Sequence, residues 1–154
     1  MALFLGEYST AVDPKHRLAI ASDLREQIVP AEDGENWVLV LGPNKRLWLY
    51  PDLAYRRMMS QIQRSPLPSR QAGKIGLLFA MARYLKGDTQ GRIVLPTTSM
   101  ERAGIGEEPV VLAGQGDHVE IWPKQAWEDY VKDGLPGYGE MLYDAADLYQ
   151  PGGQ

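Results

Sequence analysis

Residues 12–20 read VDPKHRLAI, and residues 88–95 read DTQGRIVL. Both stretches contain an aspartate followed four positions later by an arginine, a pattern written here as D-x-x-x-R: Asp13 with Arg17, and Asp88 with Arg92. Each arginine begins a short apolar run with large residues at alternate positions, Leu18 and Ile20 or Ile93 and Leu95, which is typical of a β-strand. The chain therefore carries one turn-and-strand motif twice, and this repetition decides how the fold is interpreted.

The repeat extends well beyond the two motifs. A shift of 75 residues superimposes the second motif on the first. A shift of 72 residues places VEIWP (119–123) on LWLYP (47–51), so the loops between the matched segments differ by three residues. Because order, spacing and residue type all recur, we interpret residues 1–62 and 77–132 as two copies of one unit.

Each copy predicts four strands and two short helices. In the first copy the expected strands are LFLGEYSTAV, RLAIA, WVLVLG and LWLYP, and the expected helices are SDLREQI and PDLAYRRMMSQIQ. In the second copy the corresponding strands are FAMARYLKG, RIVLP, PVVLAG and VEIWP, and the helices are TSMERAGI and PKQAWEDYVKD. This order predicts the α+β class. One such unit is too small to bury much core, so the two are expected to pack together or interlock.

Two segments fall outside the copies. Residues 63–76, which include SPLPSRQAG, predict a linker that runs into a segment able to begin as a helix. Residues 133–154 are rich in Gly, Pro and acidic residues, which predicts a flexible tail with one or two helical turns near residues 140–149.

Composition excludes several classes of protein. The 154 residues are 44% hydrophobic and 23% charged, as in ordinary globular proteins. There is no cysteine, and two histidines are too few for a zinc site without carboxylate help. No apolar run approaches the ~20 residues that cross a bilayer, and the first residues lack the basic region of a signal peptide. We therefore expect a cytoplasmic protein with no membrane partner, metal, cofactor or small-molecule substrate.

Charge is divided unevenly along the chain. The net charge is −4, which taken alone argues against nucleic-acid binding. Residues 1–103, however, hold 14 Lys and Arg against 10 Asp and Glu, whereas residues 104–154 hold 2 against 10. A basic body with an acidic tail is compatible with an anionic partner, and equally with a solvated basic face of no specific function.

The D-x-x-x-R motif predicts a tight turn headed by the aspartate. A carboxylate in this place accepts hydrogen bonds from the backbone N–H groups that follow it. Gly91 supplies the positive φ that the second turn needs, and His16 stands at the same place in the first. Histidine is enriched among the non-glycine residues that adopt positive φ, so the first turn is expected to survive.

The two arginines are open to two interpretations. Held at the start of a strand, Arg17 and Arg92 can make bidentate contacts to guanine or phosphate. Nearby basic side chains would strengthen such an anion-binding face: Lys15, His16, Arg83 and Lys86. Alternatively, each Asp–Arg pair is only a local ion pair that stabilises a hairpin.

The segments GEYSTAVDPKHRL, LWLYP, DTQGRIVLP and VEIWPKQAWEDY together resemble the MraZ family of bacterial transcriptional regulators. The resemblance covers about residues 4–132. It implies two tandem AbrB/SpoVT-type units, which are swapped-hairpin β-barrels related by a pseudo-twofold axis. It also implies a ring-shaped homo-oligomer that binds direct repeats in promoters of the cell-division and cell-wall gene cluster, in association with the nucleoid.

The same resemblance assigns roles to the motif residues. Arg17 and Arg92 would contact double-stranded DNA, with Lys15 and Gln90 beside them. The residues that shape the turns would be Asp13, Asp88 and Gly91. The first motif departs from the family pattern, because His16 replaces a glycine and Pro14 stiffens the turn, and Ala21 stands where the second copy keeps Pro96.

Two other functions compete with DNA binding. An enzyme is disfavoured because the chain lacks G-x-S-x-G, H-E-x-x-H and Walker A sequences, and AGQGDH (113–118) predicts a β-turn rather than a phosphate cradle. The alternative is an oligomeric protein-interaction module of the same fold with weak or no DNA binding. Its anchors would be aromatic residues that more commonly form core: Trp37, Trp48, Trp122, Trp127, Tyr50, Tyr55 and Tyr130. His118, in the AGQGDH turn, is expected at the surface.

Overall fold

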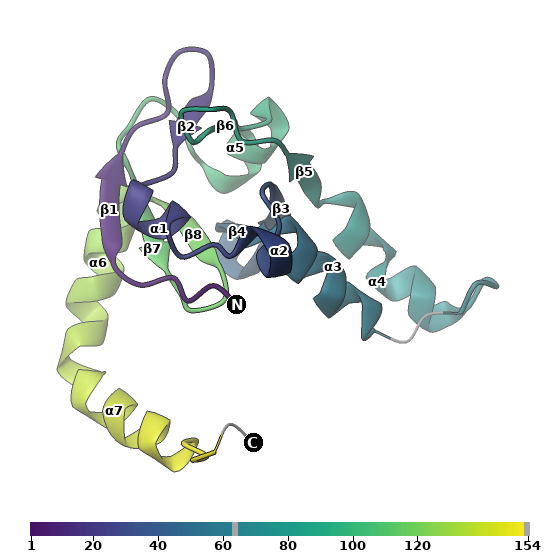
Figure 1. Cartoon of the computed structure of the whole chain (residues 1–154). Coiled ribbons are helices and arrows are strands. Elements are labelled where there is room, and N and C mark those ends of the chain that lie inside the picture. Colours follow the sequence, from purple (N-terminus) through teal and green to yellow (C-terminus); the bar gives the residue numbers. More distant parts are fainter. Residues whose placement is uncertain (63–64, 153–154) are drawn as a thin grey trace. The chain divides into compact units, whose positions relative to one another are not determined.

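The computed structural model describes residues 1–62 and 65–152, and it contains antiparallel sheets joined by short helices. The chain divides into two compact units, Met1–Lys124 and Gln125–Gln154. The first unit holds the first copy of the sequence repeat, residues 77–124 of the second copy, and every strand of the described residues (Figure 1).

The first copy contains four strands and three short helices. In chain order its elements are β1 (Glu7–Thr10), β2 (Arg17–Ala19), α1 (Ser22–Arg25), α2 (Pro30–Asp33), β3 (Trp37–Leu41), the 3-10 turn η1 (Pro43–Lys45), β4 (Leu47–Pro51) and α3 (Asp52–Ser60). α4 (Arg70–Ala80) leads from the linker segment into the second copy, which continues with β5 (Arg83–Leu85), β6 (Arg92–Val94), α5 (Thr97–Ala103), β7 (Val110–Gly114) and β8 (Val119–Pro123). The predicted third and fourth strands of each copy are confirmed.

The two copies exchange strands. A six-stranded sheet has the order β1-β7-β8-β4-β3-β5, and a separate two-stranded ribbon pairs β2 with β6. The first strand of each copy therefore pairs with the third strand of the other, and the ribbon takes one strand from each. If each strand is replaced by its counterpart in the other copy, the same strand order is obtained in reverse, so the two copies contribute to the sheet in equivalent ways. The copies interlock, as their small size predicts.

Local hairpins form the centre of the large sheet. β3 pairs with β4 along its whole length, from Trp37 opposite Pro51 to Leu41 opposite Leu47. The same holds for β7 and β8. Alternate residues of these strands point into one core, which also receives Leu18 and Ile93 from the ribbon. The ribbon is thereby fixed to the sheet by its buried face.

The first strands are shorter than predicted. β1 spans four residues and β5 only three, because Phe79 and Ala80 of the predicted FAMARYLKG strand belong to α4. α4 begins inside the segment predicted as a linker, where the Ser69 hydroxyl oxygen accepts a hydrogen bond from the N–H of Ala72 at 3.0 Å. Satisfying one of the free N–H groups of the first turn favours a helix start at this place.

The second unit is helical. α6 starts at Lys124 and runs to Gly134, as the proline before it predicts, and the 3-10 turn η2 (Leu135–Gly137) leads to α7 (Tyr138–Asp147). A ten-residue helix thus occupies the segment in which the sequence predicts one or two helical turns within a flexible tail. Within residues 1–62 and 65–152 no helix has the length and apolar character needed to cross a membrane.

Candidate functional site

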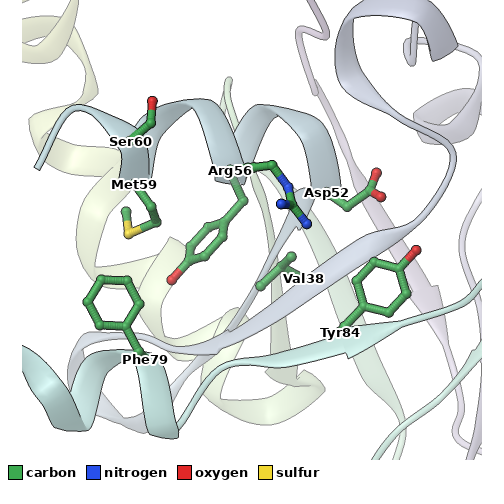
Figure 2. Close-up of a pocket in the computed structure, with 8 residues that line it drawn as sticks. Val38, Asp52, Arg56, Met59, Ser60, Phe79 and Tyr84 are labelled. Carbon is green, nitrogen blue, oxygen red and sulfur yellow. The ribbon is translucent and has the colours of Figure 1, made fainter. Parts of the chain in front are cut away.

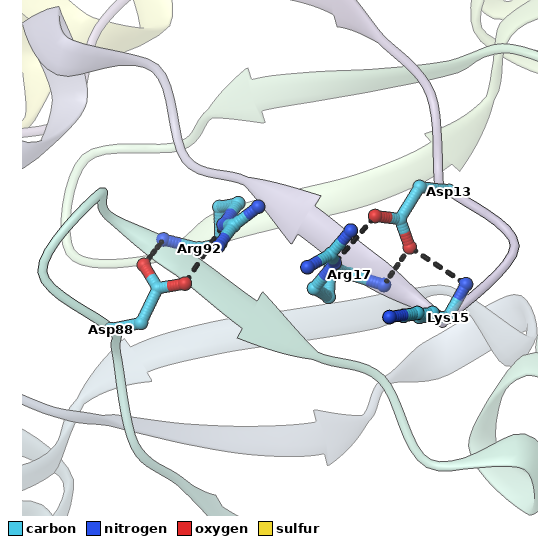
Figure 3. Close-up of polar contacts among 5 residues, drawn as sticks. All are labelled: Asp13, Lys15, Arg17, Asp88 and Arg92. Atoms are coloured by element: carbon cyan, nitrogen blue, oxygen red, sulfur yellow. Dashed lines mark hydrogen bonds and ion pairs between the residues drawn. The ribbon is translucent and has the colours of Figure 1, made fainter.

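The first D-x-x-x-R turn is closed by its aspartate. One carboxylate oxygen of Asp13, Oδ1, accepts hydrogen bonds from the backbone N–H groups of Lys15 at 2.9 Å and Arg17 at 2.8 Å (Figure 3). The backbone N–H of His16 donates to the Asp13 carbonyl at 2.9 Å. These bonds fix the position at which β2 starts, and with it the position of Arg17.

The second turn repeats this geometry. Oδ1 of Asp88 accepts from the N–H of Gln90 at 2.9 Å and from that of Arg92 at 2.8 Å. The N–H of Gly91 donates to the Asp88 carbonyl at 3.0 Å. The aspartate-headed turn predicted from the sequence is confirmed in both copies.

The third residue after each aspartate has positive φ, as predicted, but its surroundings differ. His16 has φ 62° and Gly91 has φ 76°. The Nδ1 of His16 lies 3.3 Å from the hydroxyl of Thr97, at the start of α5. A Cβ at Gly91 would instead overlap the side chain of Arg25, whose Nε donates to the Ile20 carbonyl at 2.9 Å. Glycine is therefore favoured in the second turn, where a side chain would also displace Arg25, whereas the first turn accommodates histidine.

Alanine at Gly91 is expected to destabilise the protein by about 1–2 kcal/mol, since a Cβ at positive φ is strained and here also displaces Arg25. Alanine at His16 is the matched control, because that position already carries a Cβ at positive φ. Urea unfolding of both variants measures the difference. Equal losses of stability would contradict the distinction between the two turns.

Each arginine is also paired with its aspartate. Nε of Arg17 lies 2.6 Å from Oδ2 of Asp13, and Nε of Arg92 lies 2.8 Å from Oδ2 of Asp88 (Figure 3). Among the described residues, neither arginine donates a hydrogen bond from its terminal guanidinium nitrogens; only Nε is paired. The local ion pair and an outward function are thus compatible: the aspartate holds the base of the guanidinium and leaves its outer edge available.

Both aspartates are held in the ionised form. The backbone N–H of Arg17 lowers the pKa of Asp13 below its ordinary value, and its desolvation partly opposes this. The Arg17 side chain and the Lys15 N–H lower the pKa further. Arg92 and Gln90 act in the same way on the pKa of Asp88. Because both pKa values lie below the ordinary value, the turns keep their charged closing group even at a pH at which an ordinary aspartate begins to take up a proton.

The ribbon places the two arginines on one face. Arg17 lies opposite Val94, and Arg92 lies opposite Ala19. Residues directly opposite each other in an antiparallel pair share a face, so these four side chains are on the outer face, above the buried Leu18 and Ile93. The arginines are diagonal neighbours, a relation in which Cα atoms are about 7–8 Å apart.

Ala19 and Val94 are members of this face that the sequence reasoning missed. Both are exposed, and Val94 is 56% exposed despite being apolar. The signal was present, because R-x-A and R-x-V place these residues two positions after each arginine. Two positions along a strand return to the same face.

The other predicted contact residues separate into two groups. Lys15, His16 and Gln90 lie in the two turns that flank the ribbon face. Arg83 starts β5 and pairs with Leu39 in the large sheet, and Lys86 follows that strand, ahead of the second turn. Arg83 and Lys86 are exposed but lie outside the ribbon.

The prediction for His118 is wrong: the residue is buried, only 8% exposed. Its ring stacks on Trp48, with centroids 3.9 Å apart and planes 16° apart. Its Nδ1 lies 2.7 Å from a carboxylate oxygen of Asp117, and its Nε2 lies 2.9 Å from one of Glu120. Both nitrogens must carry protons to donate to two carboxylates, so the geometry suits the charged imidazolium. The AGQGDH segment itself forms the β7–β8 turn, as predicted.

Stability is expected to fall as pH rises because of His118. Burial lowers the pKa of this imidazole, but the hydrogen bonds to Glu120 and Asp117 outweigh it, and the pKa lies above its ordinary value. A raised pKa stabilises the fold fully below the unfolded value of about 6.5 and less as the pH passes the folded value. Urea unfolding should show that the stability advantage of wild type over His118→Gln shrinks across this range. An advantage independent of pH would contradict the charged pairing.

In the described part of the chain, no three His, Asp or Glu side chains are grouped so that they could hold a metal ion. The candidate binding features are the paired turns and the outer face of the ribbon, which carry the two arginines.

Comparisons with known proteins show what the chain is related to. The model of the MraZ protein family, described as antitoxin-like, matches residues 3–76 and 78–134, which include both turns. A protein of Heliobacterium modesticaldum named "Transcriptional regulator MraZ" is 34% identical over 147 residues, which cover 95% of this chain and 99% of the relative. Proteins of the same name from Clostridium tetani (32% over 129 residues; 83% and 87% covered) and Bifidobacterium longum (31% over 143 residues; 92% and 91%) are similarly related.

Proposed function

Because the chain belongs to the MraZ family, we propose that it is a transcriptional regulator that binds double-stranded DNA through the outer face of its β2–β6 ribbon. The relatives that carry this name are regulators, and the chain is accordingly not an enzyme. The single observation that carries the DNA contact is the placement of Arg17 and Arg92 on one face, each held by its own aspartate.

The geometry of the ribbon suits duplex DNA. The major groove of B-DNA admits a two-stranded β-ribbon, and arginine pairs bidentately with guanine O6 and N7. Arg17 and Arg92 use Nε for their aspartates, which leaves the terminal nitrogens for a base edge or a phosphate. Ala19 and Val94, between them, offer apolar contacts that suit a thymine methyl group. From the two turns, Lys15, His16 and Gln90 would contact the sugar–phosphate backbone of the DNA on either side of the ribbon.

Assembly completes the proposal. The strand exchange between the copies supports two AbrB/SpoVT-type swapped-hairpin units, residues 1–62 and 77–132. We assign the protein to a ring-shaped homo-oligomer in the cytoplasm, associated with the nucleoid, that binds direct repeats in the promoter of a cell-division and cell-wall gene cluster. One ribbon on a chain of net charge −4 would bind weakly, and several ribbons aligned by a ring would add avidity.

The test is titration of the protein with the duplex from upstream of its own gene. Binding should weaken steeply with salt, since each phosphate contact contributes roughly −0.9 to the slope of log affinity against log salt concentration. A duplex of equal length with scrambled repeats should bind at least about tenfold more weakly, the loss that removal of one or two base contacts causes. Protein that ignores both duplexes at low salt would reject DNA binding and favour the interaction module.

A further inference from the structure

α7 carries an apolar stripe and an acidic face. Tyr138, Met141, Leu142 and Ala145 recur at the spacing that places residues on one side of a helix. All are exposed, and no residue of α7 is buried. Glu140 and Asp144 are one turn apart and border the stripe, Asp147 is also acidic, and the helix contains no basic residue.

α4 carries the complementary surface. Arg70, Lys74, Leu77 and Leu78 follow the same helical spacing and form one exposed face. Leu77 is 67% exposed, and the helix contains no acidic residue. The face is thus apolar with two long cationic side chains, whose aliphatic stems can lie along apolar surface while their charged ends reach past it.

A pocket opens beside α4. It has a volume of about 280 Å³ and lies between α3, the end of α4 and β5. Figure 2 shows Met59 of α3 and Phe79 of α4 facing each other across it, with Arg56 extending from α3 above Val38. The wall is mainly apolar and aromatic, which suits the ring of a tyrosine.

From these two surfaces we infer that α7 of one chain docks on α4 of a second chain in the oligomer. The apolar stripe of α7 covers Leu77 and Leu78, a tyrosine of α7 enters the pocket, and Glu140 and Asp144 meet Lys74 and Arg70. The inference rests on the proposed oligomer and names the surfaces that build it.

Charge selects this pairing over the symmetric ones. Two α7 helices packed together would bring six carboxylates to one contact, and two α4 helices would bring four cations. Like charges across an interface weaken binding, whereas acidic α7 against basic α4 is complementary. In the proposed ring this contact is heterologous: α7 of each chain meets α4 of the next chain, and a heterologous contact that closes generates a ring.

Charge exchange tests the contact in the full-length protein. The α4 variant is Arg70→Glu with Lys74→Glu, the α7 variant is Glu140→Lys with Asp144→Lys, and a third protein combines all four changes. Light scattering after gel filtration should show wild type as an oligomer and each two-residue variant reduced toward the 17.2 kDa of one chain. The combined protein should regain the wild-type mass. The control is Glu128→Lys with Asp133→Lys on α6, which changes the net charge by as much as the α7 variant does. This control should keep the mass of the wild-type oligomer.

The apolar stripe has its own test. Met141→Ser with Leu142→Ser should also reduce the mass, with helix content checked by circular dichroism. Wild-type mass in either α7 variant, no recovery in the combined protein, or a monomeric wild type would overturn the inference. So would tighter DNA binding by the α7 variants at unchanged mass, since α7 would then compete with DNA. DNA binding is measured separately with a duplex that contains a single repeat. Variants of reduced mass should still bind this duplex weakly, so a loss of the interface and a loss of the DNA site give different results.

Discussion

Replacing both Arg17 and Arg92 with alanine should abolish specific DNA binding. Each bidentate arginine–guanine contact is worth about 1–3 kcal/mol, so losing both weakens specific binding by roughly 30-fold to 10⁴-fold. The turns should survive, because Oδ1 of each aspartate bonds backbone N–H groups and not the arginine side chain. Fluorescence anisotropy with the upstream duplex measures the loss.

Two control proteins separate the contact from net charge. Arg102→Ala with Lys132→Ala removes the same charge from exposed helical positions and should bind nearly as wild type. Lysine at positions 17 and 92 keeps the charge but not the planar fork, so it should retain non-specific binding and lose preference for the repeats. Specific binding that persists in the double alanine protein, with its fold and mass intact, would remove the arginines from the site.

The first copy alone, residues 1–62, should not fold as a monomer. Of its strand pairs only the β3–β4 hairpin lies within the segment, since β1, β2 and β3 take partners from β7, β6 and β5. An isolated hairpin is marginally stable at best in water. Circular dichroism should show no cooperative unfolding transition for dilute residues 1–62, while an equimolar mixture with residues 65–154 should regain one.

The control is the full chain with a protease site in residues 65–69, which should keep its fold after cleavage because strand pairing holds the copies together. Association of two first copies is compatible with exchange, since one could supply the partner strands of the other. The deciding observation is concentration dependence. Cooperative unfolding of residues 1–62 with a midpoint independent of concentration would show that the copy does not need exchanged strands.

The local elements of this fold could be predicted from sequence. WVLVLG and LWLYP are apolar runs of strand length, rich in β-branched and aromatic residues, and are joined by a short turn, so the β3–β4 hairpin follows from neighbouring residues alone. The partner of β1 lies about a hundred residues away and leaves no periodic signal. The glycine and acidic content of residues 133–154 favours a flexible tail, and the helical spacing of Tyr138, Met141, Leu142 and Ala145, which α7 confirms, is the weaker signal in this segment.

The candidate site divides in the same way. The aspartate-headed turns and the positive φ of His16 and Gly91 were predictable, since a turn depends on five consecutive residues. The burial of His118 was not, because its stacking partner Trp48 and the strand that carries it come from the other copy. A polar residue in a short turn is ordinarily exposed, and only tertiary pairing reverses that expectation.

The strand exchange also determines when the fold can be completed during translation. Glu7 pairs with Ala113, so β1 leaves the ribosome long before its partner has been translated. At synthesis rates of about 5–20 residues per second the interval lasts roughly 5–20 seconds. During it the nascent chain presents unpaired strand edges, which are templates for association with other chains. Completion of the second copy ends this exposure, so the last strands of the sheet act as the closing step of biosynthesis.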